Sequence, residues 1–98
     1  MEIKKTQEGN DLVIAVSGRL DTTTAPELEE CIKDSVEGVE NLTLDLSELE
    51  YISSAGLRVL LAAQKIMTKQ GSMKVTGVGE VVMEIFEVTG FADILTIE

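Results

Sequence analysis

The chain has 98 residues, a formal net charge of −10, a single cysteine and no histidine or tryptophan. Without histidine, catalysis by Ser-His-Asp or Cys-His groups is excluded within the chain, and the commonest metal ligand is missing. The acidity argues against direct nucleic-acid binding, no apolar run nears the roughly 20 residues that cross a bilayer, and Cys31 cannot form an internal disulfide, so one cytoplasmic domain over residues 1–98 is expected.

The first 17 residues predict a β-hairpin. Residues 2–7 alternate weakly between polar and apolar side chains, and residues 8–11, Glu-Gly-Asn-Asp, are typical of a turn. Residues 12–17, Leu-Val-Ile-Ala-Val-Ser, are rich in β-branched residues and almost wholly apolar. This composition indicates a covered strand.

The first helix is predicted after this strand is broken by residues 18–21, Gly-Arg-Leu-Asp. The segment Thr22-Thr-Thr-Ala-Pro combines a candidate threonine cap with an early proline, as helix starts often do. Residues at helical spacing then form one apolar stripe: Leu28, Cys31, Ile32, Ser35 and Val36. Its place on this stripe favours Cys31 as a small core residue over a reactive thiol.

The remaining elements alternate between strand and helix. Strands are predicted at residues 42–46 and 73–77, helices at 55–70 and 80–88, and a last short strand at 94–97. The resulting order ββαβαβαβ indicates a single α/β domain. Its sheet is expected to be mixed, with four to five strands and helices packed on it.

Two loops are candidates for a functional site, because partners of open α/β sheets usually meet the loops beyond the carboxyl ends of the strands. These loops are residues 18–24 and 47–55. If the strands before them are parallel neighbours, Asp21 and Ser54 lie on the same rim of the sheet. Asp21 would then either cap a turn or interact with the Ser54 hydroxyl.

Ser53 and Ser54 immediately precede the helix predicted at 55–70. A serine at the N-cap contributes about 1 kcal/mol, which explains one of the two serines. Gly56 in the first turn costs up to about 1 kcal/mol relative to alanine, and is easier to understand where another backbone or a phosphate approaches closely. A phosphate on Ser54 would add a charge of about −1.5 to −2 and be tolerated by the helix dipole. Arg58, one turn further, is either a contact for such a phosphate or a solvated surface residue.

Two other candidate motifs give weaker evidence of a function. Gly77-Val-Gly79 lacks the Lys-Ser/Thr of a phosphate-binding P-loop and is predicted to be a strand-to-helix turn. The adjacent acids Glu29 and Glu30 have no convergent partner, so neither a metal site nor glycosidase chemistry is expected.

Three blocks of the sequence resemble the STAS family, and within it the small stand-alone anti-sigma-factor antagonists. The most specific block runs from Leu44-Asp-Leu through Tyr51-Ile-Ser-Ser-Ala-Gly-Leu. The second is Val16-Ser-Gly-Arg-Leu-Asp, and the third, weaker one is Phe86-Glu-Val-Thr-Gly-Phe-Ala-Asp-Ile. The resemblance covers nearly all residues.

The resemblance implies a phosphorylation switch. In that family, a serine or threonine at the start of this helix is phosphorylated by a kinase that is also the anti-sigma factor, and a phosphatase resets it. The matching acceptor is Ser54. Ser53 is the alternative, because an aspartate is frequent at its position in the family. The implied partner-binding surface comprises Asp21, Thr22, Thr23, Ser53, Ala55, Gly56 and Arg58.

The expected function is therefore that of a non-enzymatic anti-sigma-factor antagonist. Its expected partners are an anti-sigma serine kinase, which brings ATP and Mg²⁺, and a serine phosphatase; no cofactor, metal, membrane or direct nucleic-acid contact is expected. One alternative is a constitutive STAS adaptor of a larger complex, with Ser54 as a cap only. Another is an acyl-carrier-type protein, but that class is all-helical and the apolar runs at 12–17 and 42–46 count against it.

Overall fold

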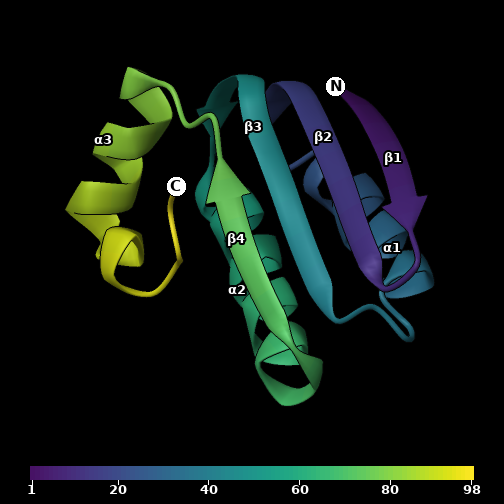
Figure 1. Ribbon diagram of the computed structural model, residues 1–98. Helices are drawn as coiled ribbons and strands as arrows, with labels where there is room; N and C mark the ends of the chain where they lie inside the picture. Colours follow the sequence, from purple (N-terminus) through teal and green to yellow (C-terminus); the bar gives the residue numbers. More distant parts are fainter.

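Four strands form one mixed sheet in the computed structural model, which describes residues 1–98 (Figure 1). The sheet has the order β1 (Glu2–Glu8), β2 (Asp11–Leu20), β3 (Asn41–Ile52) and β4 (Ser72–Thr76). The first two strands form the predicted antiparallel hairpin, and β3 lies parallel to both β2 and β4. The α/β class and the mixed sheet are thus confirmed.

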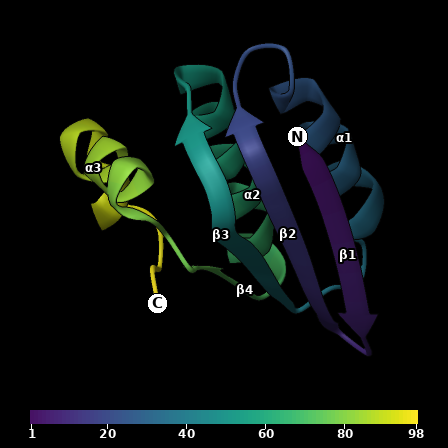
Figure 2. The ribbon, with the colours of Figure 1, turned by 90° about the horizontal axis from the view of Figure 1, so that it is seen from above.

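The two longer helices pack on the same face of this sheet. Both α1 (Ala25–Ser35) and α2 (Ser54–Gln70) lie behind it, and no helix covers the opposite face (Figure 2). The third helix, α3 (Glu80–Thr89), lies beyond β4 at the edge of the sheet (Figure 1). None of the helices is long and apolar enough to span a membrane.

The strand predicted at residues 94–97 is reduced to one bridge between Val75 and Ile97. A 3₁₀ turn, η1 (Phe91–Asp93), precedes it, and the buried Leu95 anchors the chain after that turn. Only the residues after Leu95 remain to run along β4, so the sheet has four strands rather than five.

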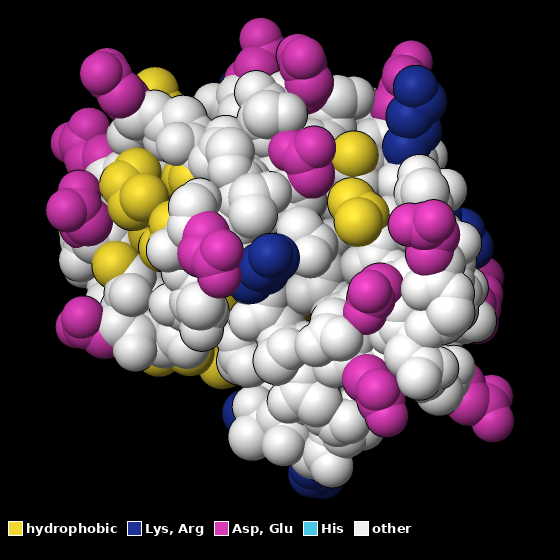
Figure 3. Space-filling view, viewed as in Figure 1, with side chains coloured by type: hydrophobic (Ala, Val, Ile, Leu, Met, Phe, Trp, Pro, Cys, Tyr) yellow, Lys and Arg dark blue, Asp and Glu magenta, His cyan; other side chains and the backbone are white.

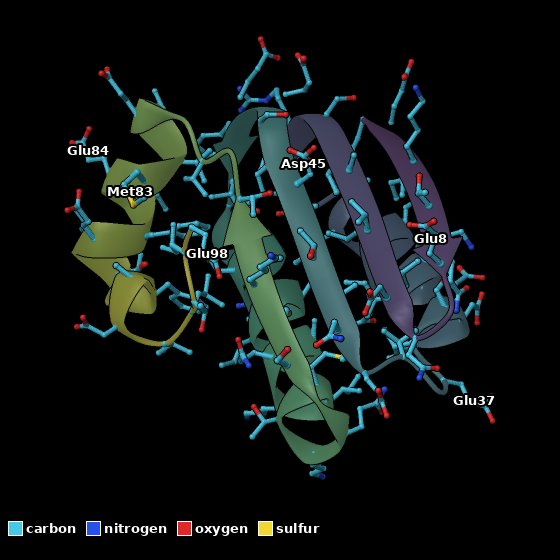
Figure 4. All side chains as sticks on the ribbon, viewed as in Figure 1. Glu8, Glu37, Asp45, Met83, Glu84 and Glu98 are labelled. Atoms are coloured by element: carbon cyan, nitrogen blue, oxygen red, sulfur yellow. The ribbon has the colours of Figure 1, made fainter.

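The core lies between the sheet and the two helices behind it. Alternate residues of β2, such as Leu12 and Ile14, face those helices and are buried. The residues between them face the other side, where Val13 keeps 38% of its surface exposed and the side chain of Asp45 stands on the neighbouring β3 (Figure 4). The prediction of a covered strand is therefore wrong for one face of β2. The apolar run Val-Ile-Ala-Val does not show that helices cover only one face of the sheet.

β3 continues to Ile52 instead of ending at Leu46. Its register against β2 shifts twice, and at each shift β3 carries one extra residue. The buried residues Leu46, Leu49 and Ile52 consequently follow one another at intervals of three, which breaks the alternation that marks a strand in the sequence. The predicted loop at residues 47–55 is for the most part bulged strand.

Candidate functional site

The candidate site forms where β2 and β3 end side by side. Leu20 pairs with Ile52, and the backbone N–H of Ser53 donates to the Leu20 carbonyl at 2.8 Å. The chain leaves β2 through Asp21 and leaves β3 through Ser53 at this same edge. The expectation that the two connections share one rim is confirmed, although both are shorter than predicted: β2 reaches Leu20, and Ser53 alone separates β3 from α2.

The carboxylate of Asp21 organises the first connection. Its Oδ1 accepts from the Thr23 hydroxyl at 2.8 Å and from the Thr23 and Thr24 amides at 3.0 and 3.2 Å. The Thr23 hydroxyl is the main reason that the pKa of the Asp21 carboxyl lies below its ordinary value. Of the two roles considered for Asp21, the structure shows the turn cap, and the carboxylate makes no hydrogen bond to Ser54.

Ser53 is the cap of α2. Its backbone is extended, and its Oγ accepts from the Gly56 amide at 3.4 Å. Capping thus accounts for the first of the two serines. Ser53, whose hydroxyl makes this bond, is only half exposed.

Ser54 is the first residue of α2 and is exposed. None of the side-chain hydrogen bonds at this helix start involves its hydroxyl, since the one present belongs to Ser53. The first N–H groups of a helix have no acceptor within it, which applies here to Ser54 and Ala55. An oxygen-rich anion on the Ser54 side chain would meet these donors and the positive end of the helix dipole.

Gly56 faces the core and is buried. A Cβ at this position would lie 2.8 Å from Cγ1 of Ile52 and 2.8 Å from Cγ of Leu20. The glycine therefore allows α2 to approach the ends of β2 and β3. This packing explains Gly56 without a phosphate: the close neighbours at this residue are the side chains of Leu20 and Ile52, where the sequence suggested another backbone or a phosphate.

A shallow groove of about 160 Å³ lies between the starts of α1 and α2. One of its lining residues, Ala55, directly follows Ser54 in the sequence. The three predicted residues Thr22, Ala55 and Arg58 line it, and sequence reasoning missed the others, which are Ala25, Pro26, Glu29 and Val59. The lining combines apolar side chains with one acid, Glu29, and one base, Arg58. Helical spacing alone could not reveal this groove, because the two helix starts are about 30 residues apart in the sequence.

The remaining predicted side chains are accessible. Thr22, Thr23 and Arg58 are exposed. Arg58 follows Ser54 by one helical turn, which places both on the same side of α2. Arg19, which was not singled out, lies on the same rim with its guanidinium 4.5 Å from the centre of the Tyr51 ring.

Comparisons with known proteins match the whole chain. A family model described as STAS domain matches residues 2–98. The anti-sigma-B factor antagonist of Bacillus subtilis is 33% identical over 92 residues, covering 93% of this chain and 84% of that protein. The protein of the same name from Listeria monocytogenes is 33% identical over 101 residues, covering 100% of this chain and 87% of that protein.

Solved structures agree with these sequence matches. The crystal structure of an anti-sigma factor antagonist from Mycobacterium paratuberculosis superposes with a TM-score of 0.89 at 28% identity, covering 98% of this chain and 83% of that one. The relatives are named for a regulatory antagonism rather than for a catalysed reaction, which agrees with the expectation of a non-enzymatic protein.

Proposed function

The chain belongs to the STAS domain family, and on this basis we propose that it acts as an anti-sigma factor antagonist. In its unmodified form it binds an anti-sigma factor that is also a serine kinase, and the sigma factor is released. The kinase, which supplies ATP and Mg²⁺, transfers the γ-phosphoryl group of ATP to the Oγ of Ser54. ADP leaves, the hydroxyl proton passes to the kinase, and the modified protein dissociates until a serine phosphatase removes the phosphate.

One observation carries this proposal: of the two serines at the start of α2, only Ser54 offers a free hydroxyl. Ser53 uses its Oγ to cap the helix and is half-buried, whereas Ser54 is exposed and its hydroxyl has no partner in the chain. A kinase reaches Ser54 without breaking the cap. This difference supports Ser54 over Ser53 as the acceptor.

A phosphate on Ser54 would change the surface while leaving the fold in place. It would add a charge of about −1.5 to −2 at a helix N-terminus, where the dipole and the Ser54 and Ala55 amides favour an anion. Arg58, one turn along α2, is within reach of it. The rim of the α1–α2 groove would become strongly negative, so a partner that docks on the unmodified rim would lose affinity.

The docking surface that we assign to the kinase joins this groove to the Asp21 turn. Thr22 and Thr23 expose their side chains there, and Ala55 and Arg58 contribute from α2. Asp21 contributes indirectly, because its carboxylate holds the turn that presents both threonines.

Intact-mass measurement after incubation with the cognate anti-sigma kinase and Mg-ATP tests the acceptor. Wild type and Ser53→Ala should each gain one phosphoryl group, and Ser54→Ala should gain none. Ser47→Ala, which removes an exposed hydroxyl from β3, is the matched control and should be modified like wild type. A phosphate that persists in Ser54→Ala would overturn the assignment, and no phosphate on wild type would favour the constitutive adaptor.

Binding measurements test the switch separately from the chemistry. Ser54→Asp should bind the unloaded kinase at least about tenfold more weakly than wild type, which corresponds to about 1.4 kcal/mol. Ser54→Asn has a similar volume without the charge and should retain most of the affinity. Equal affinity of wild type and Ser54→Asp would contradict the switch even if Ser54 is phosphorylated.

A further inference from the structure

Most of the large hydrophobic side chains that are exposed in this chain lie on α3 or on the turn that follows it. Of the four large hydrophobic side chains that are exposed in the chain, three lie here: Val81 at 57%, Val88 at 81% and Ile94 at 47%. Val81 and Val88 are seven residues apart, or about two helical turns, so they share one side of α3.

This exposure is not the result of a loosely attached helix. The opposite side of α3 carries Val82 and Phe86, which are both fully buried. The helix ends at Gly90, whose left-handed backbone, with φ of 83°, is a regular helix stop. The helix α3 is thus well anchored and carries apolar residues on both of its sides. Only one of these sides is covered.

The charged residues of this part of the sequence are all acidic. From Val75 to the end of the sequence there is no lysine or arginine, and all five acids are exposed. Glu98 pairs with Lys74, and the other four accompany the apolar residues: Glu80, Glu84, Glu87 and Asp93. Figure 3 shows hydrophobic side chains over α3 set among Asp and Glu side chains.

We propose that the outer side of α3 together with the turn that follows it, comprising Val81, Val88, Ile94 and the four acids, is a second docking surface for a basic amphipathic segment of a partner protein. The apolar residues of that segment would cover the valines, and its lysines or arginines would meet the acids. Such charge complementarity speeds association and sets specificity. The proposal goes beyond the Ser54 switch and does not depend on it.

Charge also decides against other occupants. A second copy of this chain would bring acids against acids, which disfavours a dimer across this side. Nucleic acids and anionic membrane surfaces are repelled by an acidic patch without a base. A protein segment that is both basic and apolar is the occupant that remains.

Titration with a synthetic helical peptide tests this surface on the full chain. The probe has leucines on one side, lysines on the other and one tryptophan. Because the chain lacks tryptophan, the fluorescence reports the peptide alone. Val81→Ser/Val88→Ser should raise the Kd about fivefold or more by removing apolar contact area. Serine has a helix propensity close to that of valine, so α3 should persist, which far-UV circular dichroism checks.

Matched variants locate the interaction. Val13→Thr, on the open sheet face, should change the Kd less than about twofold. Glu84→Gln/Glu87→Gln should weaken binding and reduce its salt dependence, whereas Glu30→Gln/Asp34→Asn on α1 should do so much less. If the double valine variant does not fold, Val88→Ser alone, at the most exposed position, replaces it.

Three results would overturn the proposal. One is an unchanged Kd for the valine variant, and another is equal binding of a peptide in which glutamates replace the lysines. The third is a wild-type dimer in sedimentation that the valine variant abolishes, because a second copy would then be the occupant.

Discussion

Replacing Gly56 by alanine tests whether the start of α2 is set by packing against the strand ends. The new Cβ would lie 2.8 Å from Cγ of Leu20 and from Cγ1 of Ile52, and 3.1 Å from Cδ2 of Leu20. Carbon atoms in good contact are about 3.5–4.0 Å apart, so side chains or the helix must shift.

The magnitude follows from two opposing effects. Overpacking of a core by one methyl group costs about 1–3 kcal/mol. Alanine recovers up to about 1 kcal/mol over glycine in a helix, and less in the first turn. The free energy of unfolding should therefore fall by about 1–2 kcal/mol, and the Tm by about 4–8 °C for each kcal/mol. Urea unfolding followed by far-UV circular dichroism measures this loss.

A double-mutant cycle identifies the cause. Leu20→Ala removes the two closest Leu20 atoms while the contact with Cγ1 of Ile52 remains, so in that background Gly56→Ala should cost less than in the wild type. The packing argument is refuted if Gly56→Ala is as stable as wild type, or if the two substitutions are additive. A purely phosphate-directed glycine would show both of those results.

Further predictions concern the rest of the site and the helix ends. Ser53→Ala should lower the free energy of unfolding by about 0.5–1 kcal/mol through loss of the cap, and Ser54→Ala should change it by less than about 0.5 kcal/mol; a reversed order would move the cap to Ser54. Because the folded pKa of Asp21 is depressed, its contribution to stability is present above the unfolded pKa of about 4 and is lost as the pH falls through the folded pKa. Asp21→Asn should hence destabilise at pH 7 more than at acidic pH in urea titrations, and a constant difference would contradict the turn-cap role. Gly71→Ala should cost about 2 kcal/mol or more in the same assay, because its Cβ would overlap the Glu40 carbonyl, and a neutral result would show that this backbone contact is not maintained.

The spacing of apolar residues was sufficient to predict the elements whose buried residues form one regular stripe. The hairpin and the three helices were predicted within a few residues, because each helix buries one stripe and the turn at Gly9 has local turn chemistry. The shared rim expected for Asp21 and Ser54 followed from a general property of parallel strands, which end at one edge of the sheet.

What could not be predicted depends on partners that are distant in the sequence. The extension of β3 to Ile52 is invisible to a period of two, since each bulge is defined by the pairing with β2. The exposure of Val13 depends on the absence of a helix over one face of the sheet. A run of apolar residues does not reveal such an absence.

The same limit applied to the candidate site. Which serine caps α2 depends on where β3 ends, and a difference of one residue exchanges the roles of Ser53 and Ser54. The packing role of Gly56 depends on Leu20, which is more than 30 residues away in the sequence. Local sequence preferences thus placed the cap and the special glycine in the correct segment. They did not identify which serine caps the helix or which side chains Gly56 contacts.

The two extra residues of β3 make the orientation of the helix start sensitive to the length of this strand. Side chains along a strand alternate between its faces, so deleting one residue between Leu46 and Ile52 would turn Ile52 toward solvent. Ser54 would rotate with it, and its hydroxyl would point elsewhere without any change to the residues around it. Loss-of-function deletions are therefore expected in a segment that contributes no side chain to the α1–α2 groove. The same deletion would also remove the close packing of Gly77 against Ser47 at the first bulge.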